Sequence, residues 1–211
     1  MTRPSGEAPS QSEPSGGLAQ GPERVPEIDD WSRLLDGRVA VVTGGGSGIG
    51  RAISRLFAEH GALVEIVEID PHRAAAAVED IEATGGTARA HVVDVASDAE
   101  VEDLRVAVVG EHGRVDVLVN NVGDYRPLVR FHESTPESWQ AMYSTNLEHV
   151  FRVTRAFLEP MVDGGGGSIV NVHSVEGMRG FPGEPVYADR KSVVEVTSVE
   201  LGGLRTIKEK K

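Results

Sequence analysis

The chain has 211 residues, a net charge of −12 and no cysteine. This length fits one domain with a sizeable core, and the acidic charge argues against nucleic-acid binding, which needs a basic surface. The absence of cysteine excludes disulfides, thiolate metal sites and a cysteine nucleophile, and the scattered histidines indicate no metal. No apolar run approaches the roughly 18 residues of a membrane helix, so we expect a soluble, cytoplasmic protein with no membrane partner.

The first 30 residues are rich in Pro, Ser, Gly and Glu and carry almost no large apolar side chain. Such a segment buries too little surface to offset its loss of conformational entropy, which predicts a disordered tail over 1–30. The rest of the chain divides into one domain over 31–205 and a short charged tail over 206–211.

The domain opens with a strand, a glycine-rich turn and a helix. Residues 38–50 read RVAVVTGGGSGIG, in which a β-branched run predicts a strand over about 38–43. Apolar residues at helical spacing then predict a helix over 48–60, which stops at Gly61. A turn of this kind lets the backbone approach a pyrophosphate, and the helix N-terminus offers it free N–H groups. An ordinary tight turn is the alternative, whereas a P-loop is excluded because no Gly-Lys-Ser/Thr follows.

Strands and helices alternate through the rest of the domain. We predict strands over 63–69, about 89–93, 115–120 and 168–173, and helices from about 71, over 98–112, over about 136–161, and around 187–191. Repeated strand–helix units are typical of the α/β class with a doubly wound parallel sheet of the Rossmann type. Ligands of such sheets bind beyond the carboxyl ends of the strands.

Tyr187 and Lys191 stand four residues apart in the run YADRK. On a helix this spacing puts both side chains on one face, one turn apart. An ammonium group beside a phenol lowers the tyrosine pKa, so that the phenol can exchange a proton near neutral pH. The same spacing also occurs on any solvated helix face, and the pair alone does not decide between the two interpretations.

Taken with the glycine turn, these residues resemble the short-chain dehydrogenase/reductase family. The TGxxxGIG motif of the family corresponds to Thr43–Gly50, and its NNAG motif to Asn120–Gly123 with Val122 in place of alanine. The resemblance runs from about residue 35 to about residue 201. It implies an NAD(P)-dependent oxidoreductase that transfers a hydride between nicotinamide and a small secondary alcohol or ketone.

The catalytic tetrad of the family falls on Asn146, Ser174, Tyr187 and Lys191. The resemblance implies that Tyr187 is the acid/base and that Lys191 lowers its pKa and holds the nicotinamide ribose. Ser174 would hold the substrate oxygen, and Asn146 would hold a water that extends the proton relay.

The resemblance also implies a set of cofactor-binding residues. Glu68, at the end of the second strand, would accept hydrogen bonds from the adenosine ribose and repel a 2′-phosphate. The glycine turn carries Ser47 where many NADP-using relatives have a basic residue, so NAD(H) is expected in preference to NADP(H). The full set is Gly44, Ser47, Gly48, Ile49, Gly50, Glu68, Asp94, Val95, Asn120, Gly123, Tyr187 and Lys191.

The sequence departs from the family after the catalytic helix. The strands, the substrate loop and the second nicotinamide contact expected there are replaced by a short charged ending. We therefore expect a sheet that lacks the last two strands usual in the family and leaves 168–173 as an unpaired edge. An alternative function follows, a truncated and catalytically defective module that binds a dinucleotide or associates with other chains. A homo-oligomer is compatible with either function.

Overall fold

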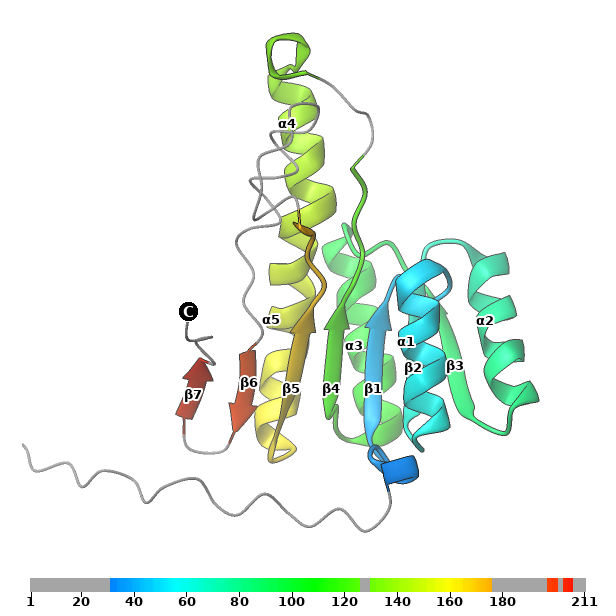
Figure 1. Ribbon diagram of the computed structural model, residues 1–211. Helices are drawn as coiled ribbons and strands as arrows, with labels where there is room; N and C mark the ends of the chain where they lie inside the picture. Colours follow the sequence, from blue (N-terminus) through cyan, green and yellow to red (C-terminus); the bar gives the residue numbers. More distant parts are fainter. Residues whose placement is uncertain (1–30, 126–129, 176–196, 201–202, 207–211) are drawn as a thin grey trace, which may run out of the picture.

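Strands and helices alternate along the chain and build a sheet that carries helices on both faces (Figure 1). The computed structural model describes residues 31–125, 130–175, 197–200 and 203–206. The strands are β1 (Val39–Thr43), β2 (Leu63–Glu68), β3 (Thr87–Val92), β4 (Val117–Asn120), β5 (Gly166–Asn171), β6 (Thr197–Glu200) and β7 (Gly203–Thr206). The helices are α1 (Gly48–Glu59), α2 (Pro71–Ala83), α3 (Asp98–His112), α4 (Pro136–Tyr143) and α5 (His149–Asp163), with shorter segments η1 (Trp31–Arg33), η2 (Phe131–Glu133) and η3 (Ser144–Glu148).

The strand order in the sheet is β3-β2-β1-β4-β5-β6-β7, and the strands from β3 to β5 are all parallel. The chain runs outward from β1 through β2 to β3 and then returns to place β4 on the other side of β1. This reversal makes a switch point at the carboxyl ends of β1 and β4. The doubly wound parallel sheet predicted from the sequence is confirmed over these five strands.

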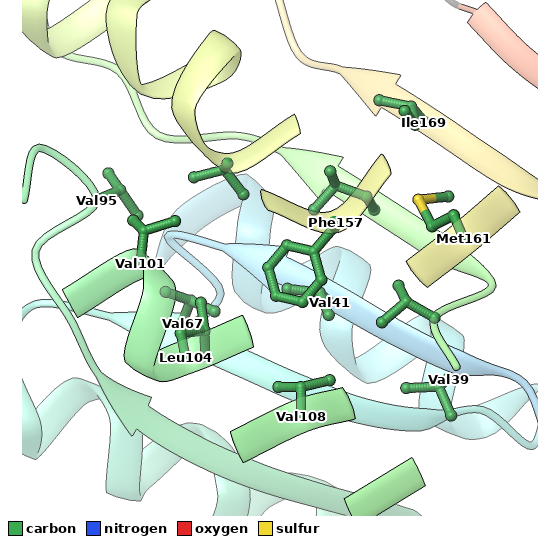
Figure 2. Close-up of a cluster of buried hydrophobic side chains, with 13 residues drawn as sticks. Val39, Val41, Val67, Val95, Val101, Leu104, Val108, Phe157, Met161 and Ile169 are labelled. Atoms are coloured by element: carbon green, nitrogen blue, oxygen red, sulfur yellow. The ribbon is translucent and has the colours of Figure 1, made fainter. Parts of the chain in front are cut away.

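Alternate residues of β1 belong to two separate cores, because successive side chains of a strand point to opposite faces. Val39 and Val41 pack in the core that α3 and α5 cover, and Ala40 and Val42 pack in the core under α1 and α2. Figure 2 shows Phe157 of α5, which is fully buried, pointing toward Val41. Burial on both faces explains why the sequence of β1 is a continuous apolar run.

The helix predicted over about 136–161 is interrupted. It consists of α4, a five-residue π-helical segment η3, and α5, which continue one another in Figure 1. A π segment inserts residues into an α-helix and occurs frequently at functional sites. Asn146 lies within this segment.

The sequence predicts no strand after β5, and the structure adds two short ones. β6 and β7 are antiparallel, and β6 pairs with the first part of β5 so that Ser168 faces Ser198 and Ile169 faces Thr197. The prediction of an unpaired edge is therefore wrong for these two residues of β5. The segment contains β-branched Thr197, Val199 and Thr206, which favour strands, although the residues that follow are mostly charged. The helix expected around 187–191 lies outside the described residues.

Candidate active site

The glycine loop between β1 and α1 forms a tight backbone cradle at the carboxyl end of β1. Gly44 has a φ of +63°, and a Cβ there would lie 2.9 Å from Nδ2 of Asn121. A Cβ on Gly50 would lie only 2.1 Å from the carbonyl oxygen of Gly44, so that only glycine fits where the first turn of α1 meets the loop. Gly48 also has a positive φ, of +51°, but no atom lies within 4 Å of its Cβ position, which leaves that part of the backbone open.

The N-terminus of α1 adds hydrogen-bond donors to this cradle. Ser47 is the residue before the helix, and its hydroxyl caps no N–H group among the described residues. Ile49, in the first turn, is 64% exposed. Uncapped N–H groups and the helix dipole favour an anion at such a position. The open backbone at Gly48 and these donors fit the pyrophosphate of a dinucleotide.

Asn121 closes the loop from the neighbouring strand. Its backbone N–H donates to the Thr43 hydroxyl at 2.9 Å, and its Nδ2 donates to the carbonyl oxygens of Thr43 and Gly44 at 3.0 and 3.4 Å. The Thr43 hydroxyl in turn donates to the carbonyl oxygen of Val119 at 3.2 Å. These bonds hold the ends of β1 and β4 together at the switch point. Asn121 belongs to the Asn120–Gly123 motif but is not among the cofactor-binding residues that the sequence predicts.

Asn120, which the sequence predicts as a cofactor residue, points its side chain into the protein. Its Nδ2 donates to Oδ1 of Asn171 at 2.8 Å and to the hydroxyl of Thr154 at 3.0 Å, and the residue is 1% exposed. The side chain thus joins β4 to β5 and α5. Strand alternation was the signal that could have separated Asn120 from Asn121, because adjacent residues face opposite ways. Gly123, also predicted, is exposed two residues beyond Asn121.

Glu68 stands at the end of β2, next to the glycine loop, and is 5% exposed. Its Oε1 accepts hydrogen bonds from the backbone N–H groups of Ile69 and Asp70 at 3.1 and 3.3 Å. Its Oε2 would lie 2.9 Å from a Cβ on Gly46, so this oxygen is directed to the loop. The structure therefore places the Glu68 carboxylate next to the glycine loop.

Asp94 and Val95 follow β3 at the same edge of the sheet. Asp94 is half-buried, its Oδ1 accepts from the backbone N–H of Ala96 at 2.9 Å, and its own N–H donates to Glu100 at 2.7 Å. Val95 is buried in the core beside α3, and its carbonyl oxygen accepts a bond from Arg152 at 3.3 Å. Of this pair, only Asp94 carries a carboxylate at the strand end.

Asn146 is held by the loop that follows β4. Its Nδ2 donates to the carbonyl oxygens of Asp124 and Met142 at 2.8 and 3.1 Å, and its Oδ1 accepts from the N–H of Asp124 at 3.1 Å. The side chain is therefore clipped to both backbone groups of Asp124 and buried, with 2% exposure. This contact places the π segment η3 against the loop that follows β4.

Ser174 lies three residues beyond the end of β5 and is half-buried. The N–H of Val172 donates to the carbonyl oxygen of Asn120 at 2.9 Å, which continues the β4–β5 pairing almost to Ser174. Ser174 is thus at the carboxyl edge that also carries the glycine loop, Asn121 and Asp124. Tyr187 and Lys191, the other two members of the predicted tetrad, lie outside the described residues.

Comparison with known proteins agrees with this arrangement. Residues 38–202 match the sequence profile of the short chain dehydrogenases. The chain belongs to the short-chain dehydrogenase/reductase family. It is 39% identical over 162 residues to a 3-oxoacyl-[acyl-carrier-protein] reductase of Chlamydia muridarum, a match that covers 75% of this chain and 64% of that protein. The chain thus spans slightly less than two thirds of this relative.

Two solved structures of the family are similar in fold. A 7α-hydroxysteroid dehydrogenase complexed with NADH and 7-oxo glycochenodeoxycholic acid has a TM-score of 0.72 and 31% identity, with 76% of this chain and 62% of that chain covered. A metagenomic short-chain oxidoreductase in complex with NADP has a TM-score of 0.71 and 34% identity, with 74% and 71% covered. Short-chain dehydrogenase/reductases bind nicotinamide cofactors, and these two proteins hold different ones.

In the described ranges of this short-chain dehydrogenase/reductase, 31–125, 130–175, 197–200 and 203–206, the structure contains neither a metal-binding cluster nor a helix able to cross a membrane. Within these ranges no group of three or more His, Asp or Glu side chains is arranged to hold a metal ion. None of the helices in the same ranges has the length and apolar character that a bilayer crossing requires.

Proposed function

We propose that this chain transfers a hydride between a nicotinamide dinucleotide and a secondary alcohol or ketone. The observation that supports this function most directly is the glycine cradle with the carboxylate of Glu68 against Gly46. A loop that excludes side chains, followed by an uncapped helix N-terminus, suits a pyrophosphate, and an acidic group one strand away suits a ribose diol. Gly44, Ser47, Gly48, Ile49 and Gly50 would surround the pyrophosphate, and Asp94 would lie near the adenine.

Four residues take part in the proposed chemistry. A bound nicotinamide supplies the hydride in reduction or accepts it in oxidation. Tyr187 gives its phenolic proton to the substrate oxygen in reduction, or takes the hydroxyl proton in oxidation, and Lys191 lowers its pKa. Ser174 donates a hydrogen bond to the same oxygen as charge develops on it. Asn146 positions the water through which the proton reaches solvent.

We further propose that NAD(H) is preferred to NADP(H). Oε2 of Glu68 faces the glycine loop, where a ribose hydroxyl can donate to it and a 2′-phosphate would be repelled. The loop itself offers Ser47 and no cation to balance a phosphate. Relatives hold either cofactor, so that this preference depends on the residues of this chain.

A single pair of measurements tests the function. NADH binding is followed by fluorescence, and NADH oxidation is followed by the loss of the absorbance of the reduced nicotinamide, with a panel of aliphatic, cyclic and aromatic ketones. Binding with turnover of any ketone supports the proposed enzyme. Binding without turnover supports the alternative, a dinucleotide-binding module, and absence of binding contradicts both.

A further inference from the structure

Arg73, in the first turn of α2, is paired with two carboxylates beside the glycine loop. Its Nη2 lies 3.4 Å from Oε1 of Glu68, and its Nε lies 3.5 Å from Oδ2 of Asp70. Both distances are longer than a strong charge-assisted hydrogen bond, which is about 2.8 Å. The Arg73 side chain is also 50% exposed. The guanidinium is therefore held by electrostatic attraction to the two carboxylates and remains accessible to solvent.

The glycine loop touches the same turn of α2. A Cβ on Gly46 would lie 2.7 Å from Cγ of Glu68 and 3.1 Å from the backbone carbonyl carbon of Arg73. The loop, the end of β2 and the start of α2 are thus in mutual contact. A ribose bonded to Glu68 would lie beside the guanidinium that pairs with the same carboxylate.

Asp70 has two roles in this turn. Its Oδ1 accepts from the N–H groups of His72 and Arg73 at 2.9 and 3.1 Å and caps α2, while its Oδ2 faces the Arg73 guanidinium. The backbone hydrogen bond from Arg73 is the main cause that lowers the pKa of Asp70, with the bond from His72 and the Arg73 charge adding to it. Asp70 is consequently ionised at neutral pH and competes for the guanidinium with any other anion.

A guanidinium binds phosphate well, because its planar donors match two phosphate oxygens. A 2′-phosphate carries about two negative charges. Given the dinucleotide site proposed above, we propose that Arg73 is a second specificity residue, a latent 2′-phosphate ligand that Asp70 and Glu68 keep occupied. The preference for NAD(H) then rests on Glu68 together with the Asp70–Arg73 pair.

The test is a double-mutant cycle on Asp70 and Arg73, with NADH and NADPH each titrated by fluorescence at fixed low ionic strength. Asp70→Asn frees the guanidinium, while asparagine still caps the helix. Arg73→Gln removes the cation. The pair Arg55–Glu59 on α1 is the matched control, because it is also exposed and one helical turn apart, at 3.5 Å. Its variants Arg55→Gln and Glu59→Gln change the net charge by the same amounts.

We expect Asp70→Asn to tighten NADPH binding by about three- to five-fold, the range of an exposed ion pair, and to leave NADH binding within about two-fold. The gain should vanish in Asp70→Asn/Arg73→Gln, and neither control should reproduce it. An equal gain in NADPH affinity with and without Arg73, or a gain in Glu59→Gln, would overturn the inference. The net charge of the chain would then explain the tighter binding. Binding of both cofactors with an unchanged ratio overturns the inference too, yet leaves the dinucleotide site standing. If the unmodified chain binds neither cofactor, the proposed function itself fails.

Discussion

Asn121 donates its side-chain amide to the carbonyl oxygen of Thr43 at 3.0 Å, across the switch point of the sheet. The same two residues share a second bond, from the Asn121 N–H to the Thr43 hydroxyl at 2.9 Å. Thr43 is fully buried, so water cannot replace these bonds. The conformation of the glycine loop therefore depends on a residue 78 positions away in the sequence.

Asn121→Ala should weaken NADH binding by about ten-fold, because the loss of one or two buried hydrogen bonds loosens the loop that holds the pyrophosphate. Fluorescence titration measures the effect. Asn171→Ala is the matched control. It removes the hydrogen bond from Asn120, which has a similar length, but Asn171 lies on β5, away from the glycine loop. Both variants should lower the free energy of unfolding by about 1 kcal/mol. Equal NADH affinities in the two variants would show that Asn121 has no part in the site.

The structure near the glycine loop was predictable because its signals are local. The apolar run of β1, the glycines that follow and the helical spacing of α1 all lie within one short stretch of the sequence. The role of Asn121 was missed because it depends on strand register, and the π segment around Asn146 was missed because STNLEHVF has an ordinary helical pattern. The contacts of Glu65 with His91 and His112 join residues 26 and 47 positions apart, and no local sequence pattern indicates them.

Glu68→Gln should reduce the preference for NADH. The substitution keeps the volume next to Gly46 and removes the charge that would repel a 2′-phosphate, so NADPH should bind more tightly and NADH less tightly. Adding Ser47→Arg should move the preference further toward NADPH, because a guanidinium then stands in the loop. Titration of both cofactors gives the ratio of affinities. Tighter binding of NADPH than of NADH by the unmodified chain would contradict the assignment of Glu68.

Tyr187→Phe should reduce ketone reduction by about 10²- to 10⁴-fold, the usual contribution of a general acid–base residue. The ring is kept, so the affinity for NADH should change little. Single-turnover rates with excess enzyme, measured across pH, separate loss of the proton donor from slower product release. If the variant keeps near-normal turnover, a group other than Tyr187 is the acid–base residue.

Glu65 of β2 is buried between two histidines on the α3 face of the sheet. His112, in the last turn of α3, lies 2.6 Å from Oε1, and His91 of β3 bonds Oε2. Arg89 of β3 and Glu111 of α3 form an ion pair close by. Burial alone would raise the pKa of Glu65, but the hydrogen bonds and charges of the two histidines outweigh it and lower this pKa below its ordinary value of 4.5.

The lowered pKa of Glu65 predicts that the stability of the fold depends on pH. A carboxyl with a lower pKa in the folded state stabilises the fold above the pKa of the unfolded chain and loses that contribution as pH falls through the folded value. Glu65→Gln should therefore be less stable than the unmodified chain by about 1–3 kcal/mol at about pH 5, and the difference should shrink toward about pH 3. Urea unfolding at several pH values measures it. Glu111→Gln, an exposed neighbour, should show a smaller effect, and a difference for Glu65→Gln that stays constant with pH would contradict this account.

The edge of β5 should depend on β6 for protection, a strand that the sequence does not predict. Ser168 and Ile169 are paired with Ser198 and Thr197 of β6, so a chain stopped immediately before β6 should expose the N–H and C=O groups of an uncharged strand. Such edges recruit other strands, and we expect faster hydrogen exchange at 166–169 and association in sedimentation experiments. A chain stopped after Thr206 keeps β6 and β7 and loses only residues 207–211, which makes it the matched control. If both shortened chains exchange at the same rate over 166–169, β6 does not protect β5 in solution.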